Sequence, residues 1–201
     1  MDTTFFWKRG KDQFGVTVFR SPSLKRNLLW KVVDKENMET YRNGVLELES
    51  TGWIIEAIVC DGRKGFFSAF SPCYLVQMCQ FHQVQIVTRY LTRHPKTEAG
   101  KALRKLILLL TKTDKESFVY WIDEWYQTYQ SFLGEQTINP ETNRKQFTHK
   151  RLRSAYRSIM NNMPYLWTWY DYIHDISIPN TTNCLDGTFS HINSKVNVHR
   201  W

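Results

Sequence analysis

The sequence predicts an α/β fold in which an antiparallel meander of strands leads into the parallel strands of one mixed sheet. Three runs of β-branched and aromatic residues, at 3–6, 14–20 and 28–33, are separated by brief turns. Such close neighbours pair antiparallel, because parallel neighbours need a crossover of a dozen or more residues. The run 53–60 is almost continuously apolar, which is typical of a parallel strand covered on both faces.

The meander is followed by a helix predicted at 39–50. Tyr41, Val45 and Leu48 are spaced i, i+4 and i+7, so they share one face, and Gly52 ends the periodic stretch. We expect this helix to be the crossover that carries the chain from the meander to the strand at 53–60.

The next segments complete the first part of the fold. Asp61 and Gly62 end the strand, a short helix is predicted at 65–70, and a second apolar strand at 74–79. The order strand, strand, strand, helix, strand, helix, strand is that of a ribonuclease H-like core, although other α/β sheets share it. Asp61 then lies at the carboxyl end of a strand, where open α/β sheets bind their ligands.

A long segment with almost no strand signal follows, and we predict that it is an all-α insertion. Its helices are expected at 83–91, 98–110, 116–132, 150–160 and 165–174, with breaks at sites such as 139–140 and 161–164. The chain therefore divides into three parts: 1–83 as the first part of the core, 84–176 as the helical insertion, and 177–201 as a C-terminal helix that completes the core.

The C-terminal helix is predicted from an apolar stripe with i, i+4, i+7 and i+11 spacing. Its members are Leu185, Phe189, Ile192 and Val196. Asp186 lies beside the stripe, so a helix docked on the sheet by this stripe would point Asp186 along the edge that carries Asp61.

Composition favours a polyanionic partner. The 201 residues carry a net charge of +8, and clustered cations gain affinity by displacing counterions from phosphates. A basic protein without such a partner is the alternative. The densest basic stretch lies in the insertion and could bind DNA or simply form a solvated helix face; its members are Arg144, Lys145, Lys150, Arg151, Arg153 and Arg157.

Cysteine content and hydropathy indicate a cytoplasmic protein. Four cysteines without a repeated pair spacing do not form a disulfide framework in a chain of this size. The sequence holds no apolar run near the ~20 residues that a membrane span needs. We therefore expect reduced thiols and no membrane association.

Three ordered motifs carry a family resemblance. They are the pair Asp61-Gly62, the pair Cys79 and His82, and the run that contains Asn183 and Asp186. With Lys195, His199 and Arg200 downstream, the chain resembles the Mutator-like superfamily of DDE transposases, which includes bacterial insertion-sequence transposases.

The resemblance implies a catalytic triad of Asp2, Asp61 and Asp186, with Cys79, His82 and Asn183 in supporting roles. Asp186 stands where the family usually has Glu. The implied cofactor is a pair of Mg²⁺ or Mn²⁺ ions, since phosphoryl transfer on DNA uses two divalent ions about 3.5–4 Å apart. The implied partners are DNA, as element ends and target, contacted also by Lys195, His199 and Arg200, and further copies of the chain, in the bacterial nucleoid.

The family comparison also leaves alternatives. Asp2 directly follows the first methionine, so we expect an N-terminally truncated catalytic fragment that lacks the start of its first strand and a DNA-recognition domain. A catalytically inactive, transposase-derived DNA-binding fragment is the alternative, and an unrelated metal-dependent nuclease is a third possibility.

Each candidate residue also has a structural explanation. Asp61-Gly62 fits a simple turn, Asp2 a disordered terminal residue, and Asp186 the third position of a capping box with Asn183 as N-cap. Cys79 and His82 supply only two of the four ligands of a structural zinc site. We therefore expect a structural role for this pair, with His82 orienting groups near Asp61.

Overall fold

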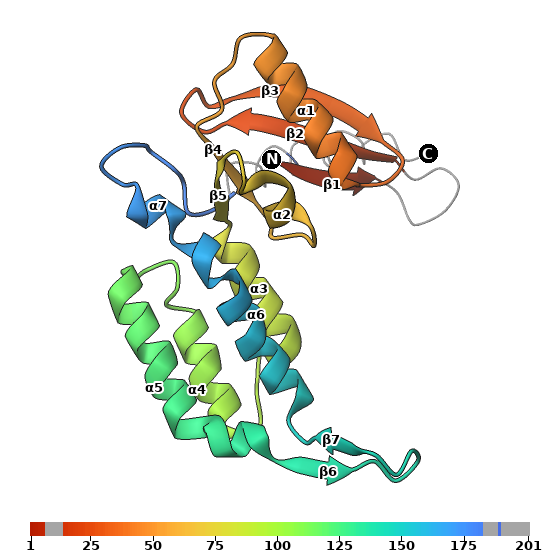
Figure 1. The fold of residues 1–201 in the computed structure, drawn as a ribbon, viewed down its shortest axis with the longest axis vertical. Helices are drawn as coiled ribbons and strands as arrows, with labels where there is room; N and C mark the ends of the chain where they lie inside the picture. The colour runs from red at the N-terminus through yellow and green to blue at the C-terminus, as the bar shows by residue number, and fades with distance from the viewer. Residues whose placement is uncertain (7–13, 183–188, 190–201) are drawn as a thin grey trace, which may run out of the picture.

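The computed structural model describes residues 1–6, 14–182 and 189, and it confirms a mixed α/β fold with antiparallel and parallel strands (Figure 1). Strands β1 (Asp2–Phe6), β2 (Phe14–Ser21) and β3 (Arg26–Val33) form the predicted meander, in the order β1-β2-β3. Helix α1 (Met38–Ser50) follows and packs on this sheet with its Tyr41, Val45 and Leu48 face.

The parallel strands form a second, smaller sheet. Strand β4 (Ala57–Cys60) pairs with β5 (Leu75–Met78), and the connection between them contains α2 (Phe66–Phe70). The expected single mixed sheet is thus two sheets, which touch where the Met1 ammonium donates to the Val59 carbonyl at 2.9 Å. The predicted strand residues 53–56 lie outside β4, because β5 offers a partner to only four residues.

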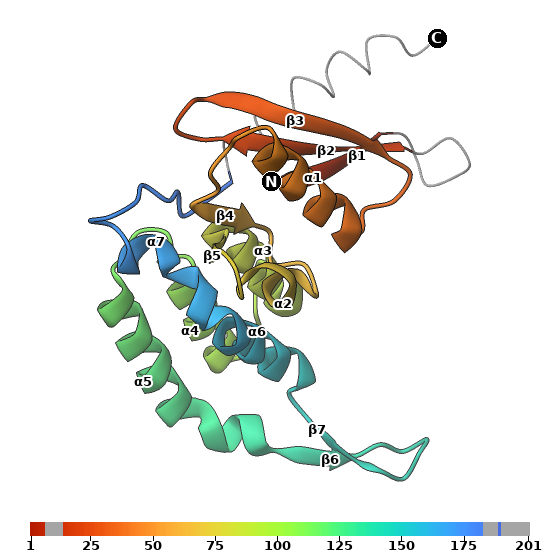
Figure 2. The same cartoon turned by 45° about the horizontal axis from the view of Figure 1, so that its top comes forward.

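The chain then forms a block of helices below the sheets (Figure 2). Its members are α3 (Gln80–Leu91), α4 (Glu98–Ile107), α5 (Lys115–Gly134), α6 (Lys150–Leu166) and the short α7 (Thr168–Asp171). The helices fall in the predicted order, with α3 beginning three residues earlier than expected.

The prediction of an all-α insertion is wrong between α5 and α6. Strands β6 (Gln136–Ile138) and β7 (Lys145–Phe147) form an antiparallel hairpin that projects from the block (Figure 1). Its turn is closed by the Asn139 side chain, which accepts hydrogen bonds from two backbone amides, and by Asn143 with φ +50. The segment has no apolar helical face, so a local turn determines its conformation.

Helix α6 also runs through the break predicted at 161–164. Pro164 lies inside the helix, where it lacks a donor and usually ends or kinks the structure. Packing of the two residues after the proline offsets this cost: Leu166 is fully buried, and the Tyr165 ring stacks on Phe67 with 3.9 Å between centroids. The predicted helix 165–174 is therefore divided between the end of α6 and α7.

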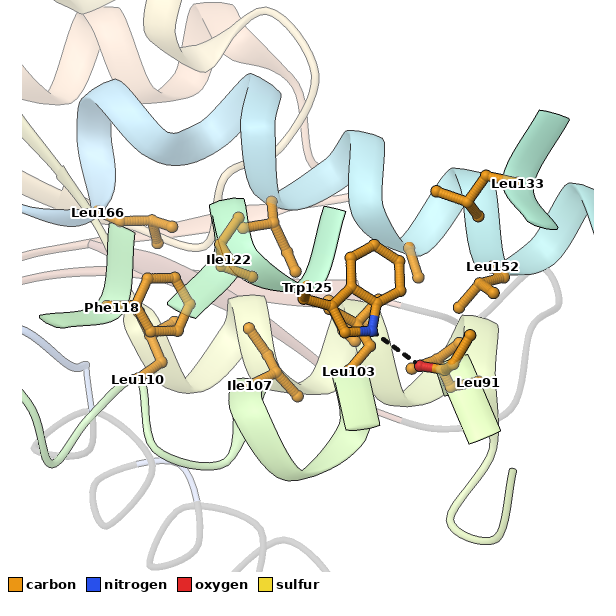
Figure 3. Close-up of a cluster of buried hydrophobic side chains, with 14 of the residues drawn as sticks. Leu91, Leu103, Ile107, Leu110, Phe118, Ile122, Trp125, Leu133, Leu152 and Leu166 are labelled. Carbon is orange, nitrogen blue, oxygen red and sulfur yellow. Dashed lines mark hydrogen bonds between the residues drawn. The ribbon is translucent and has the colours of Figure 1, made fainter. Parts of the chain in front are cut away.

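The helical block has a closed apolar core (Figure 3). Leu103, Ile107, Phe118 and Ile122 are fully buried in it, and the Trp125 indole donates to the Ala99 carbonyl at 3.0 Å. Within the described residues, no helix combines the length and apolarity that crossing a bilayer requires.

Three buried glutamines, one on β5 and two on α3, bond to α6. Gln77 and Gln80 both donate to the Leu166 carbonyl at 3.0 Å, and Gln83 donates to Ser158 and accepts from Asn162. Each is fully buried. Since buried polar groups are costly without partners, these bonds fix how α3 and α6 dock.

The predicted C-terminal helix lies almost entirely outside the described residues. Phe189 is the exception: it is helical, 7% exposed, and packs against Val18 of β2. Leu185, Ile192 and Val196 of the predicted stripe lie outside the described part.

Candidate metal centre

Asp61 follows the carboxyl end of β4, as predicted, in a tight turn. Its Oδ1 accepts a hydrogen bond from the Arg63 amide at 3.0 Å. Gly62 has φ +77, and a Cβ at this position would lie 2.5 Å from the Met78 methyl carbon. Both observations require glycine here, so the Asp61-Gly62 pair fixes the direction in which the chain leaves the strand.

Asp2 is part of β1, where it pairs with Val18 of β2, and it is not a disordered terminal residue. Its Oδ1 accepts from the Thr3 amide at 2.7 Å. The bond from Met1 to Val59 places the start of β1 beside the end of β4. These two strand ends bring Asp2 and Asp61 together.

Glu36 is a third acid at this place, and the sequence analysis did not identify it. One carboxylate oxygen from each of Asp2, Glu36 and Asp61 lies within 4.8 Å of the other two. This is the group of residues that could hold a metal ion in the described part of the chain. Glu36 directly precedes Asn37, the N-cap of α1, and this position is its one signal in the sequence.

A chain of hydrogen bonds fixes Glu36. The buried Tyr41 hydroxyl donates to its Oε1 at 2.5 Å and lies 2.8 Å from the Thr3 hydroxyl, which in turn lies 2.7 Å from Thr17. The Arg63 guanidinium forms an ion pair with the other oxygen of Glu36 and also donates to its backbone carbonyl. Burial raises the pKa of Tyr41, so its hydroxyl stays a donor.

The electrostatics of the acids suit a divalent cation. Burial, and then the negative charge of Asp61, raise the pKa of Asp2 above its ordinary value. Both effects penalise the ionised pair, and a cation between the carboxylates would relieve the repulsion. Carboxylate oxygens are the ligands that Mg²⁺ and Mn²⁺ prefer. The three carboxylates could therefore hold one such ion.

Cys79 and His82 lie beside the acids and contact the segment that leads to the C-terminal part. The Cys79 thiol accepts from the Thr182 amide at 3.3 Å and from its hydroxyl at 3.4 Å, and that hydroxyl lies 3.5 Å from His82 Nδ1. Burial raises the pKa of Cys79, but hydrogen bonds from His82 and Thr182 outweigh it and the net direction is downward. The pair thus anchors Thr182 next to α3.

His82 itself is biased toward its charged form. Its interaction with Cys79 raises its pKa most, burial opposes this, and the charges of Asp2 and Asp61 raise it further. The charge of His82 in turn lowers the pKa of Asp2, but by less than burial and the charge of Asp61 raise it.

The basic stretch predicted in the insertion lies on the β6–β7 hairpin and on α6, below the sheets (Figures 1 and 2). Arg144 and Lys145 are exposed on the β6–β7 hairpin, and Arg157 is exposed on α6. Arg153 has a structural role, because its guanidinium lies 3.5 Å from the Phe147 ring centroid and donates to the Leu133 carbonyl.

The two remaining members of the stretch also have intramolecular contacts, Lys150 with Gln146 and Arg151 with the Arg89 carbonyl. The other predicted site residues lie outside the described part of the chain; they are Asn183, Asp186, Lys195, His199 and Arg200.

No family model, curated protein or solved structure matches this chain. Inference about its function therefore depends on its own residues and their arrangement.

Proposed function

We propose that the chain is the catalytic domain of a DDE-type transposase with a ribonuclease H-like fold, which cleaves and joins DNA strands with Mg²⁺ or Mn²⁺. One observation carries the proposal: carboxylate oxygens of Asp2 and Asp61, from the ends of two different strands, meet within 4.8 Å. The element order from β1 to β5 supports the fold assignment.

The third acid of the proposed site is Asp186. It lies outside the described residues. Phe189 packs on Val18, and Val18 is the cross-strand partner of Asp2. The described residue Phe189 therefore packs against the strand pair that carries Asp2.

The chain's own residues have distinct roles in the proposed reaction. Asp2 and Asp61 hold the cations, and Glu36, fixed by Tyr41 and Arg63, contributes negative charge and one further oxygen. Bound divalent ions supply activation of a water or 3′-hydroxyl nucleophile and stabilisation of the leaving oxygen. His82 adds positive charge beside Asp2 and contacts the Thr182 hydroxyl.

DNA binding away from the acids fits either an active or an inactive protein. The exposed Arg144, Lys145 and Arg157 would neutralise phosphates without taking part in chemistry. Only metal-dependent cleavage distinguishes a transposase domain of the nucleoid from an inactive DNA-binding fragment.

The test is incubation of the purified chain with supercoiled plasmid and a duplex oligonucleotide carrying a free 3′-hydroxyl, with MgCl₂, MnCl₂ or EDTA. We expect nicking of the plasmid and covalent transfer of the oligonucleotide in the presence of either metal. Asp61→Asn should abolish both, whereas the exposed control Glu141→Gln should retain both.

Each other outcome assigns a different function. Nicking without transfer of the oligonucleotide would indicate a metal-dependent nuclease, and DNA binding with neither activity would indicate an inactive fragment. Cleavage that persists in EDTA or in Asp61→Asn would contradict the proposal.

A further inference from the structure

A cavity of about 370 Å³ lies between the β6–β7 hairpin and the neighbouring ends of three helices. It is lined by the end of α3, the turn before α4, one residue of β6, most of β7 and the first turn of α6. We call it the hairpin cavity. Pockets that bind small ligands measure roughly 300–1,000 Å³, so its volume suits a ligand group.

The lining carries three positive side chains and, in the described part of the chain, no carboxylate. They are Lys96, just before α4, and Lys150 and Arg151 in the first turn of α6. Lys150 bonds to the neutral Gln146 amide, Arg151 donates to the Arg89 carbonyl, and Lys96 has no ion pair among the described residues. Three like charges around one cavity repel one another, and a bound anion would relieve the repulsion.

The turn that carries Lys96 is fixed against α4. The Thr97 hydroxyl caps the helix by accepting from the Gly100 amide at 3.1 Å. Gly100 is buried, and a Cβ at this position would lie 2.9 Å from the Thr97 hydroxyl oxygen and 3.0 Å from Pro95 Cβ. The absence of a side chain at Gly100 therefore lets the turn lie close to the helix, which holds the Lys96 backbone at the cavity.

Uncharged donors complete the lining. The exposed Thr137 and Thr148 bring hydroxyl groups to it, and a hydroxyl can donate to an anionic oxygen. His149 precedes α6 without capping it through its side chain; its ring stacks on Phe132, and its Nε2 contacts Glu135 at 2.9 Å. The first turn of α6 adds its partial positive charge to that of the three cations.

The charge around the hairpin cavity indicates the chemistry of its ligand. Cations and hydroxyl donors together suit a group with several anionic oxygens, and phosphate is such a group. Positive charge continues outside the cavity, at the exposed Arg144 and Lys145 of the hairpin. Successive phosphates of one strand could contact both places at once, whereas a single small anion could not.

We propose that the hairpin cavity binds a backbone phosphate of DNA through Lys96, Lys150 and Arg151, while Arg144 and Lys145 contact neighbouring phosphates. Such binding fixes the position of the DNA relative to the helical block and carries no sequence information. It deepens the proposed function, and it rests on that function for the identity of the polyanion. It requires neither the metal nor the acids.

The test measures binding of a labelled DNA duplex by fluorescence anisotropy, in EDTA, at NaCl concentrations between about 50 and 200 mM. Lys96→Gln and Lys150→Gln should each reduce the slope of log K against log [NaCl] by about 0.9, because each removes one phosphate contact. Lys105→Gln is the matched control, since Lys105 is an exposed lysine of α4 that does not line the cavity. Its slope should equal that of the parent.

Inorganic phosphate gives a second, local readout. Titrated at constant ionic strength, it should shift the NMR amide signals of Gly100 and Thr148 in the parent and in Lys105→Gln. The shifts should be lost in the double variant Lys96→Gln with Lys150→Gln, which lacks two of the three cations.

The two readouts separate the outcomes. Unchanged slopes in Lys96→Gln and Lys150→Gln would overturn the proposal, even if phosphate shifts the amide signals, because the cavity would then not contact DNA. An equal fall in Lys105→Gln would also overturn it, since it would show an effect of net charge alone. Reduced slopes in a chain that does not nick plasmid would support the cavity and contradict the proposed function, so the two can fail separately.

Discussion

The helical block and the acid-bearing end of the molecule are held together differently. Leu103, Ile107 and Phe118 are fully buried in a closed core shared by α3 to α6. The acid-bearing end depends instead on hydrogen bonds through Tyr41 and Arg63, and it borders an open cavity. The difference indicates that the helices supply stability, whereas the acid-bearing end keeps charged groups close together at some cost in stability.

The largest expected effect is in the helical core. Leu103→Ala removes a fully buried side chain surrounded by well-packed neighbours, and we expect a loss of about 3–4 kcal/mol in the free energy of unfolding. Urea denaturation followed by circular dichroism measures it. The exposed Leu108→Ala is the control and should change stability by less than ~0.5 kcal/mol. Similar losses in both variants would contradict a closed core.

A pair of glycines tests backbone conformation in the two regions. Gly62→Ala introduces a Cβ at positive φ and in collision with Met78, so we expect a loss of about 2 kcal/mol. Gly134→Ala, at the end of α5, meets nothing within 4 Å and should be neutral or stabilise by about 0.5 kcal/mol. If both substitutions had the same effect in denaturation experiments, the Asp61-Gly62 turn would not have the geometry described.

The hydrogen bonds that join Thr3, Tyr41 and Glu36 should contribute less to the free energy of unfolding than the helical core does. Tyr41→Phe leaves the ring in place but removes the hydroxyl that joins Thr3 to Glu36, and we expect a loss of about 1–2 kcal/mol. Tyr120→Phe, at an exposed position, serves as the matched control and should lie within ~0.5 kcal/mol of the parent chain. A neutral Tyr41→Phe would show that Glu36 is held by Arg63 alone.

The smallest expected effect depends on pH. The folded-state pKa of Asp2 lies above the ordinary value of 3.8, so the folded chain binds this proton more tightly than the unfolded chain. Stability is therefore lost as pH rises from about 3.8 through the folded pKa. In EDTA, Asp2→Asn should raise the midpoint of thermal unfolding more at pH 7 than at pH 4. Glu141→Gln should show no such dependence, and an equal shift at both pH values would contradict the raised pKa.

Local periodicity explains why much of the fold could be predicted. The meander, the face of α1 with Tyr41, Val45 and Leu48, and the parallel strand ending at Asp61 all follow from spacing alone. The β6–β7 hairpin and the passage of α6 through Pro164 could not be predicted, because a local turn determines the first and tertiary packing offsets the cost of the second.

The candidate site was also predictable only in part, because contacts between residues far apart in the sequence complete it. Asp61 has a strand and a glycine to indicate its role, whereas Glu36 lies in a loop and reaches the site through contacts with Tyr41 and Arg63. In the sequence, Gln77 and Gln80 are simply polar residues, and nothing indicates that they are buried. Both donate to the backbone carbonyl of Leu166, far away along the chain, and no pattern near the glutamines shows this partner.

The central claim is that Asp2 and Asp61 together hold a divalent cation. Calorimetric titration of the metal-free chain with MnCl₂ tests it most directly, using Asp61→Asn and the exposed control Glu141→Gln alongside the parent. We predict saturable binding by the parent and by Glu141→Gln, and at least a tenfold weaker affinity for Asp61→Asn, which corresponds to about 1.4 kcal/mol. Equal Mn²⁺ affinity in the parent and in Asp61→Asn would contradict the claim.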